Sequence, residues 1–212
     1  MDRNGNVYVT GFTLGGLDGN PNAGSEDLFL VKYDTDGYPL WAPPTRQLGT
    51  TADDAAHGVA VDGNGNVYVT GFSSGGLDGN PNAGLNDTFL VKYDAGGNIK
   101  WIRQWGTIGD DIATGVAVDG SGNVYVTGTT SNAGDYDMFL VKYDTDGNPL
   151  WTPPTRQLGT TDNDTAYGVA CDSLGGVYVT GGTRGGLDGN TNTNAGVFDL
   201  FVVKYNSDGE KQ

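Results

Sequence analysis

Short runs of apolar residues alternate along the chain with segments rich in Gly, Asn and Asp. The run Val7-Tyr-Val-Thr10 recurs at 67–70, 124–127 and 177–180. Runs of this length bounded by turn residues are typical of β-strands. A second run, Asp-x-Phe-(Leu/Val)-Val-Lys-Tyr, occurs at 27–33, 87–93, 137–143 and 199–205. The two runs return in the same order four times, which predicts a repeat architecture.

The second unit defines the pattern best and predicts strands at 58–62, 66–70, 87–93 and 99–105. Its links Asp62-Gly-Asn-Gly-Asn66 and Asp94-Ala-Gly-Gly-Asn98 have the composition of hairpin turns, because Asn, Asp and Gly adopt positive φ at low cost. The strands are therefore expected to be antiparallel. Successive apolar residues within the strands indicate sheets that are covered on both faces.

Sheets of this kind, recurring 50 to 62 residues apart, predict an all-β fold, a β-propeller-type array of about four blades, each a four-stranded antiparallel sheet. A β-sandwich is the alternative, but it leaves the repeat unexplained. The Gly-Val-Ala-Val strand is small enough to lie beside the axis. The Trp-bearing strand belongs at the rim, since two of its copies contain Pro-Pro. The expected blades of this single domain are 1–49, 50–106, 107–159 and 160–212, with the first and last incomplete.

The order of motifs in each unit resembles a known family. Gly-Val-Ala-Val-Asp, Gly-Asn-Val-Tyr-Val-Thr-Gly, Phe-Leu-Val-Lys-Tyr-Asp, and Trp followed by Arg-Gln-x-Gly-Thr resemble the bacterial SBBP-type β-propeller repeat and, more distantly, the NHL-type propeller repeats. The resemblance covers nearly the whole chain. It implies part of a larger exported or cell-surface bacterial protein, and it brings no catalytic residues with it.

The net charge of −15 disfavours nucleic acid and anionic membranes as partners. No apolar run is long enough for membrane insertion, and the first residues form no signal peptide, so any export signal is expected outside this stretch. A single cysteine, Cys171, excludes an internal disulfide framework. It stands where other units have Val, and we expect a buried, inert thiol.

Long polar connections are expected together at one edge of the blades, and binding is expected there. They carry paired polar residues, which form the candidate ligand-binding face: Asp53, Asp54, Asp110, Asp111, Asn163 and Asp164. Carboxylate pairs can act in glycoside hydrolysis, but an active site is normally built once, whereas this pair repeats. Hydrogen bonding between blades is the favoured interpretation, and the second Asp of each pair could assist a neighbouring cation site.

The other long loops place oxygen side chains at alternate positions, a pattern that can converge on Ca²⁺. The candidate metal ligands are Asp18, Asn20, Asn22, Asp78, Asn80, Asn82, Asp188, Asn190 and Asn192, with Asn194 beside them. An EF-hand is excluded because Ala23 and Phe29 stand at its Gly and Glu positions. Asx turns are the favoured interpretation of these loops. Ca²⁺ binding is the alternative, and Ca²⁺ is the one candidate cofactor.

Several further residues recur with a structural pattern. An aspartate begins the third strand of every unit, five residues after an Asn, and is expected to accept loop amides: Asp27, Asp87, Asp137 and Asp199, after Asn22, Asn82, Asn132 and Asn194. The lysines of this strand are expected to pair with the recurring aspartates: Lys32, Lys92, Lys142 and Lys204. His57 is expected in a loop, and without a second His it gives zinc no basis.

We therefore expect a non-catalytic propeller scaffold that binds a protein or carbohydrate ligand. One alternative is a Ca²⁺-dependent adhesion or lectin-like module, whose long loops would order on calcium. Another is a propeller-type hydrolase or lyase, which requires a unique acid, base and Arg cluster; only Arg184 and its loop are distinctive. Open blade edges also predict a homodimer.

Overall fold

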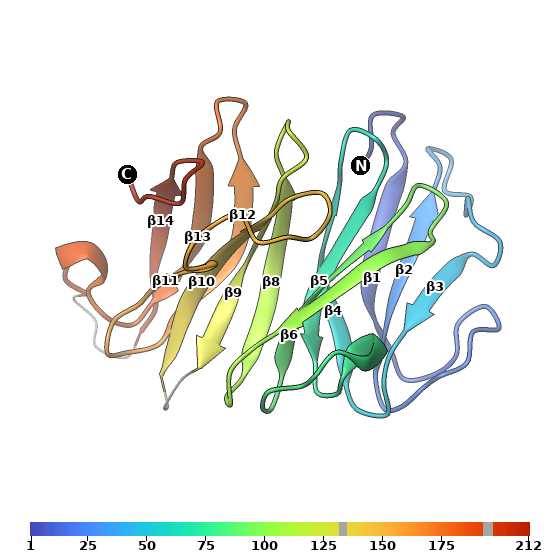
Figure 1. The fold of residues 1–212 in the computed structure, drawn as a ribbon, viewed down its shortest axis with the longest axis horizontal. Helices are drawn as coiled ribbons and strands as arrows, with labels where there is room; N and C mark the ends of the chain where they lie inside the picture. The colour runs from blue at the N-terminus through green and yellow to red at the C-terminus, as the bar shows by residue number, and fades with distance from the viewer. Residues whose placement is uncertain (132–134, 193–196) are drawn as a thin grey trace.

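The computed structural model describes residues 1–131, 135–192 and 197–212, apart from the side chain of Asp188. Within these residues the chain forms four antiparallel sheets that stand side by side (Figure 1). No helix in the described ranges has the length and apolar character needed to cross a membrane. The four antiparallel sheets confirm the expected all-β fold.

Each sheet corresponds to one repeat unit and is called a blade. Blade 1 contains β1 (Val7–Thr13), β2 (Asp27–Tyr33) and β3 (Thr45–Leu48). Blade 2 contains β4 (Asp54–Val61), β5 (Val67–Ser73), β6 (Asp87–Tyr93) and β7 (Ile99–Trp105). Blade 3 contains β8 (Asp111–Val118), β9 (Val124–Ser131), β10 (Tyr136–Tyr143) and β11 (Thr155–Leu158). Blade 4 contains β12 (Asp164–Cys171), β13 (Val177–Thr183) and β14 (Asp199–Tyr205). Two 3₁₀ turns lie in long loops: η1 (Leu77–Gly79) between β5 and β6, and η2 (Leu187–Gly189) between β13 and β14.

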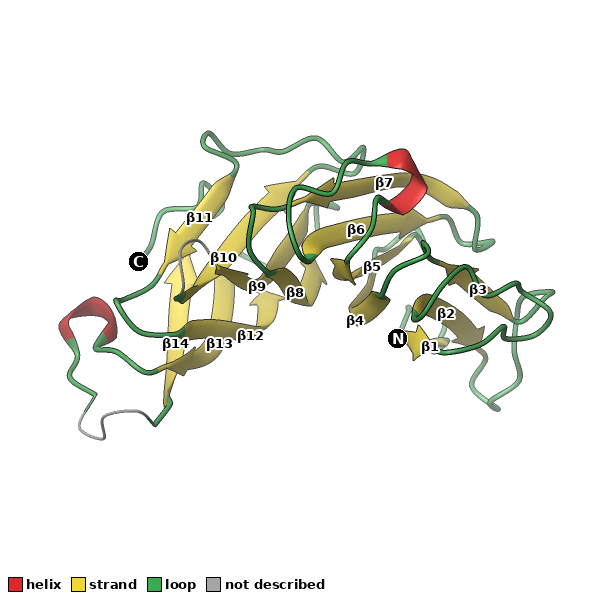
Figure 2. Cartoon of the chain, turned by 90° about the horizontal axis from the view of Figure 1, so that it is seen from below, coloured by secondary structure: helices red, strands yellow, loops and turns green. Residues whose placement is uncertain are grey.

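The blades spread as an open arc (Figure 2). Strand order within each sheet follows the chain, so β4, β8 and β12 lie along the inner side of the arc, and β7 and β11 lie along the outer side. This arrangement confirms the expected inner and rim strands. Blades 1 and 4 have three strands each, which confirms that the first and last blades are incomplete.

The rim strands differ in length for a local reason. In blade 2, β7 includes Trp101 and pairs with β6 along most of its length. In blades 1 and 3 the rim strand has only four residues and begins after Pro43-Pro44 or Pro153-Pro154. Proline lacks the N–H that a β-ladder needs, so the Trp41 and Trp151 segments leave the ladder.

Three hydrophobic clusters form the core, one at each junction between blades. The β2 side chains Leu28 and Leu30 pack against Val67 and Val69 of β5, and all four are fully buried. Equivalent residues form the other two junctions. Because blades 2 and 3 are covered by neighbours on both faces, their strands carry apolar residues at successive positions.

In blades 1 to 3 the rim segment also holds the hairpin turn of the next blade. Arg46 donates from Nε to the Gly97 carbonyl oxygen at 2.9 Å and stacks on Trp41 at 5.1 Å from the ring centroid. Trp41 donates from Nε1 to the Ala95 carbonyl oxygen at 3.2 Å. Trp101 with Arg103 and Trp151 with Arg156 repeat this contact on the turns of blades 3 and 4. We call it the rim clasp.

The inner strands correct one expectation. His57 lies within β4, at the bulge between Ala56 and Gly58, and not in a loop. Its Nδ1 is 3.1 Å from the carbonyl oxygen of Ala113 in β8. Thr114, at the same position of blade 3, donates to Ala166 of β12 at 2.7 Å. The bulge therefore turns this side chain toward the next blade.

The lysines correct another expectation. Lys92 donates from Nζ to both the carbonyl and the hydroxyl oxygen of Thr145, at 2.6 and 2.7 Å, and Lys142 donates to the Ser207 carbonyl oxygen at 2.8 Å. Only Lys32 has a carboxylate, Asp2, at 3.9 Å among the ion pairs found in the described ranges. The pairing of Lys92 and Lys142 with aspartates is therefore wrong, because turn oxygens of the next blade satisfy these ammonium groups.

Candidate functional site

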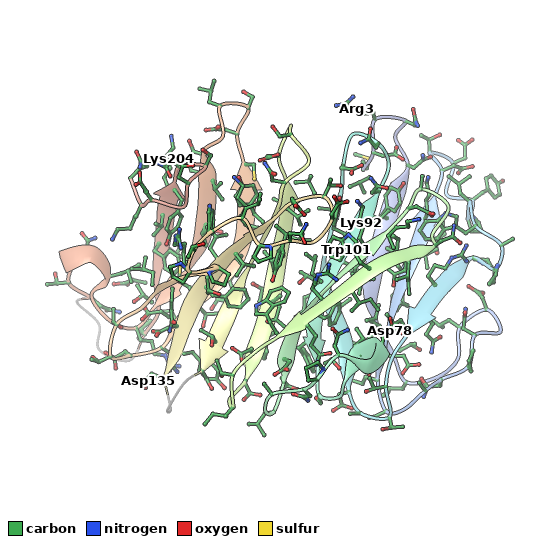
Figure 3. All side chains as sticks on the ribbon, viewed as in Figure 1. Arg3, Asp78, Lys92, Trp101, Asp135 and Lys204 are labelled. Carbon is green, nitrogen blue, oxygen red and sulfur yellow. The ribbon has the colours of Figure 1, made fainter. Side chains whose placement is uncertain are left out.

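The long connections lie together at one edge of the arc, which we call the long-loop edge. It comprises the described parts of 14–26, 74–86, 184–198, 49–53, 106–110 and 159–163. Asp78, together with Asp135 of the short β9–β10 connection at the same edge, marks its position in Figure 3, and Arg3 marks the opposite, short-turn edge. Antiparallel strands joined in chain order place alternate connections at opposite edges.

The first two long loops are fixed by rim-strand glutamines. Gln47 Oε1 accepts from Leu17 N at 2.9 Å, and Gln104 Oε1 accepts from Leu77 N at 2.9 Å. Leu77 is fully buried and belongs to the cluster between blades 1 and 2. The loops are thus anchored to the junctions, while Asp78 is exposed at their tip.

The loop asparagines direct their amide groups into the loops. Asn20 and Asn80 donate to the carbonyl oxygens of Leu17 and Leu77 at 2.7 and 2.8 Å. Asn20 also donates to the Thr45 carbonyl oxygen at 3.1 Å. The other asparagines make local contacts: Asn22 donates to Gly24, Asn82 to Leu85, Asn190 to Leu187, and Asn192 to Arg184 and Val197. These contacts are typical of turn scaffolding.

The predicted calcium ligands of these loops are only partly described by the structure, and those described make hydrogen bonds within the protein or adopt turn geometry. Asp18 Oδ2 accepts from the Thr45 hydroxyl, and Asp18 and Asp78 both adopt a φ of 52°. Asn132, Asn194 and the side chain of Asp188 lie outside the described residues. Among the described residues no three His, Cys, Asp or Glu side chains are grouped so as to hold a metal. Calcium binding by the long loops stays a prediction.

The paired residues of the other connections separate into an outer and an inner member. The outer members, Asp53, Asp110 and Asn163, accept main-chain hydrogen bonds through their carbonyl oxygens at 2.8–2.9 Å. The inner members, Asp54, Asp111 and Asp164, begin the inner strands and are at most 4% exposed. Only the outer members therefore contribute to the surface of the long-loop edge.

Each inner member caps the connection that precedes it. Asp54 Oδ2 accepts from Thr50 N at 2.5 Å and from Thr50 Oγ1 at 2.8 Å. Asp111 and Asp164 accept from Thr107 and Thr160 in the same way. The main-chain N–H of Asp54 also donates to Glu26 of blade 1 at 2.8 Å. This last contact is the hydrogen bond between blades that the repeat led us to expect.

The aspartate at the start of the third strand faces the junction that the inner member of the next blade also faces, and at the first two junctions the two carboxylates interact. Asp27 Oδ2 accepts from Ala23 N at 2.8 Å and from Gln47 Nε2 at 2.9 Å, as predicted for a carboxylate that accepts loop amides. Its charge acts on Asp54, and that of Asp111 acts on Asp87. We call Asp27/Asp54, Asp87/Asp111 and Asp137/Asp164 the junction acid pairs.

Burial dominates the electrostatics of these pairs. It raises the pKa of Asp54, and the neighbouring carboxylate of Asp27 raises it further. Burial likewise raises the pKa of Asp87, with a further contribution from Asp111. Cys171 is half-buried, which corrects the expectation of a buried side chain, but desolvation still raises the pKa of its thiol to about 12.

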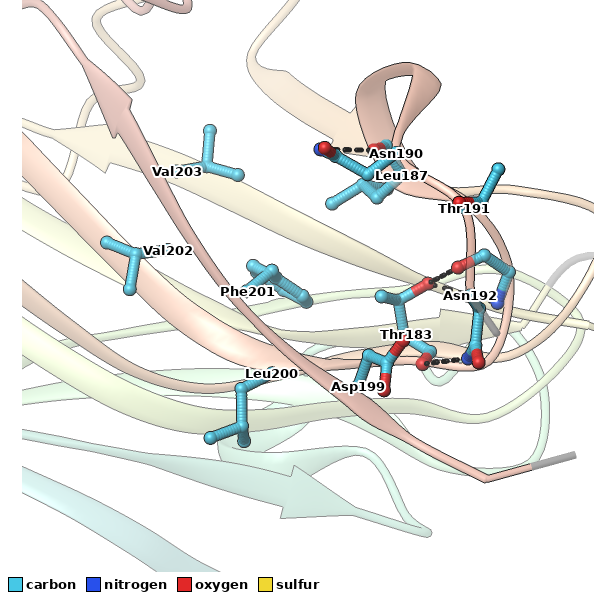
Figure 4. A pocket seen from close by; sticks show the side chains of 11 residues that line it. Thr183, Leu187, Asn190, Thr191, Asn192, Asp199, Leu200, Phe201, Val202 and Val203 are labelled. Atoms are coloured by element: carbon cyan, nitrogen blue, oxygen red, sulfur yellow. Dashed lines mark hydrogen bonds between the residues drawn. The ribbon is translucent and has the colours of Figure 1, made fainter. Parts of the chain in front are cut away.

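A cavity of about 460 Å³ follows the free edge of β14, between this strand and the fourth long loop (Figure 4). In blades 1 to 3 a rim strand pairs with the corresponding edge. Leu187, Phe201 and Val203 line the cavity and belong to the cluster between blades 3 and 4. The cavity is therefore the place where a rim strand packs in the other blades.

The model of the SBBP family, described as a β-propeller repeat, matches residues 45–78, 100–137 and 155–188. These segments make up half of the chain. The chain belongs to the SBBP β-propeller repeat family. Each match runs from the rim strand of one blade into the next blade, so it includes the connection between them and the inner member that follows it, Asp54, Asp111 or Asp164.

Two curated relatives align with the chain to different extents. The chain is 31% identical over 120 residues to the regulatory protein FlaEY of Caulobacter vibrioides, an alignment that covers 53% of this chain and 12% of the relative. It is 25% identical over 255 positions to the uncharacterized WD repeat-containing protein L264 of Acanthamoeba polyphaga mimivirus, covering 98% of this chain and 17% of the relative. The chain thus spans less than a fifth of either relative. A solved structure of a luciferin-regenerating enzyme matches with 18% identity and a TM-score of 0.46, covering 96% of this chain and 58% of that one.

Sequence reasoning identified the SBBP motif residues but missed two contacts between them. It noted Trp and Arg in the rim strand without predicting that they hold the next blade. The sequence also gives no sign that Asp27 and Asp54, which belong to different blades, interact across the junction, apart from the joint recurrence of the two aspartates in three successive units.

Proposed function

We propose that this chain is a non-catalytic structural and binding module, a section of propeller array that presents its long-loop edge to a protein or carbohydrate ligand. The greater length of the curated relatives supports a place within a larger protein, and the family resemblance supports an exported or cell-surface bacterial one. The module's outer polar residues, including Asp53 and Asp110, would face the ligand.

The observation that carries the proposal is a repeated interface that remains open at both ends. Val9 in β1 is 42% exposed, whereas Val69, at the same position in β5, is fully buried against blade 1. At the other end Val202 is 69% exposed, whereas Leu30 and Leu90 at its position are fully buried. Each end thus carries a surface that elsewhere in the chain packs against another blade.

These end surfaces fit a further blade of the same repeat. The hairpin turn of blade 1 is also free to receive a rim clasp, since no atom lies within 4 Å of a Cβ built at Gly37, whereas Trp41 contacts the equivalent Gly97. In a solution of this chain alone, a second copy supplies the blade. Contact of one end with the other is heterologous, so it produces head-to-tail association.

Sedimentation velocity across a concentration series tests this association. Moderate salt is needed because the net charge of −15 opposes contact between copies. We expect the apparent mass to rise with concentration, and Leu200→Asp to abolish the rise by placing a charge on an end face. Leu174→Asp is the matched control, since Leu174 is 94% exposed in the β12–β13 turn, away from both end faces. A chain that stays monomeric at every concentration contradicts the proposal.

A further inference from the structure

The three junction acid pairs bring negative charge together inside the protein. Asp27, Asp54, Asp87 and Asp164 are fully buried, and none of the six aspartates forms an ion pair with a described lysine or arginine. A buried carboxylate is costly unless it is paired, hydrogen-bonded or bound to a metal. The pairs therefore need a source of positive charge that the side chains do not supply.

One oxygen of each carboxylate already has its partners. The Oδ2 atoms of Asp27 and Asp54 accept the N–H and O–H groups described above. The opposite oxygens have no hydrogen-bond partner in five of the six residues: Asp27, Asp54, Asp87, Asp137 and Asp164. At two junctions, between blades 1 and 2 and between blades 3 and 4, neither aspartate of the pair has a hydrogen-bond partner at its Oδ1 atom.

A third oxygen lies beside each pair. Ser73, Thr130 and Thr183 pair across the inner ladder with Asp54, Asp111 and Asp164, and all three carry hydroxyl groups and are at most 8% exposed. The Ser73 hydroxyl donates to the Gly75 carbonyl oxygen at 2.9 Å, so its proton is engaged there. Its oxygen also accepts from Gly75 N at 3.1 Å, which leaves one lone pair to act as a ligand.

Glycine completes the arrangement at each junction. A Cβ built at Gly49 would lie 2.1 Å from Asp27 Oδ1, and one at Gly106 would lie 2.3 Å from Asp87 Oδ1. Gly159 has the same relation to Asp137. Only glycine therefore allows the unpartnered oxygen to occupy its position, and it does so at all three junctions.

We propose that each blade junction binds one divalent cation, Ca²⁺, between its paired aspartates, with the neighbouring hydroxyl as a further ligand. All the donors are hard oxygen atoms, which Ca²⁺ and Mg²⁺ prefer. Ca²⁺ fits better because Mg²⁺ retains several waters, and at the first two junctions both carboxylates of the pair are at most 4% exposed. Each ion joins the third strand of one blade to the first strand of the next. This inference does not depend on association between copies or on calcium in the long loops.

Calcium-dependent melting of the full chain tests the proposal. After dialysis against EDTA, the melting temperature is measured near neutral pH without metal, with CaCl₂ and with MgCl₂, and the stoichiometry is measured by calorimetry. We expect CaCl₂ at a hundredfold excess over Kd to raise the melting temperature by about 5–11 °C for each ion bound. We expect a smaller rise with MgCl₂ and a stoichiometry of three ions.

Two matched triple variants separate the junctions from the long loops. Asp54→Asn with Asp111→Asn and Asp164→Asn should abolish the calcium response, whereas Asp18→Asn with Asp78→Asn and Asp188→Asn should retain it. Both remove three negative charges. If the first variant does not fold, Asp54→Asn alone should lower the stoichiometry from three ions to two.

Two results would overturn the proposal. One is the absence of any calcium effect on the melting temperature or in calorimetry; the acid pairs then share protons, and Asp54→Asn, which resembles a protonated acid, should stabilise the chain in EDTA. The other is a calcium response that survives in the junction variant and disappears in the loop variant. Neither result bears on the sedimentation experiment.

Discussion

Leu28 and Leu200 occupy the same position of the repeat, yet Leu28 is fully buried and Leu200 is 90% exposed. Their strands, β2 and β14, have nearly the same sequence and the same pairing with the preceding strand. What differs is the presence of a following blade. The interior of each sheet therefore forms only at a junction, as expected for repeats that are stabilised by contact with their nearest neighbours.

The largest effect is expected from truncating these two leucines. Leu28→Ala leaves a cavity between blades 1 and 2 and should lower the free energy of unfolding by about 2–5 kcal/mol. Leu200→Ala removes an exposed side chain and should change it by no more than about 0.5 kcal/mol. Urea denaturation of dilute monomer measures both. Equal costs for the two substitutions would show that the junction contributes nothing beyond the sheet itself.

The rim clasp gives a second, smaller comparison. Gly37 and Gly147 occupy equivalent turns with φ of 84° and 78°, so alanine is strained at both, at a cost of about 1 kcal/mol. A Cβ at Gly147 would also lie 3.0 Å from Trp101, whereas one at Gly37 meets nothing within 4 Å. Gly147→Ala should therefore cost about 1–3 kcal/mol more than Gly37→Ala.

A double-mutant cycle isolates that contact. In a Trp101→Ala background the indole is absent, so Gly147→Ala should cost less, leaving the strain that Gly37→Ala reports and the contact with the Arg103 guanidinium at 3.1 Å. Both stability changes come from urea titrations, and the tryptophan fluorescence of the single variant should reveal the displaced ring. An unchanged difference in the Trp101→Ala background would mean that the turn, and not the clasp, determines the cost.

The parts of the fold that the sequence predicted are those encoded within a single blade. Turn residues such as Gly65 and Gly97 and the recurring strands determine pairing and strand order locally. Contacts between blades depend on the curvature of the arc, which no short segment specifies. Lys92 was therefore assigned a carboxylate although it reaches Thr145, and His57 was placed in a loop because the β-bulge beside Gly58 leaves no distinct sequence signal.

In the candidate site, too, features within one blade were predictable from the sequence and contacts between blades were not. The Asn-rich loops and the Asp pairs were recognised as polar clusters, and the location of the long-loop edge follows from strand order alone. The separation of Asp53 from Asp54, one exposed and one buried, follows from where β4 begins. The meeting of Asp54 with Asp27 requires two blades to pack, so it could be seen only in three dimensions.

The smallest effect is expected from acid, and it separates junction aspartates from turn aspartates. Burial raises the pKa of Asp54 and Asp87 above their ordinary value of 3.8, so the stability linked to them is fully present below 3.8 and is lost as pH rises through the folded-state pKa. The main-chain hydrogen bond from Gly176 lowers the pKa of Asp172, so its contribution is present above 3.8 and is lost as pH falls through its folded-state pKa.

Acidification of the chain in EDTA, from about pH 7 to about pH 4, should therefore raise the melting temperature, by about 2–4 °C for each kcal/mol linked to the junction aspartates. Relief of the net negative charge contributes to the same rise, so the informative quantity is the difference between variants. Asp54→Asn and Asp87→Asn should flatten the rise, whereas Asp172→Asn should leave its slope unchanged in this range. With saturating Ca²⁺ the slope should reverse, because protons then compete with the cation for the same oxygens. A slope that is identical in all three variants would place the linked charge outside the junctions.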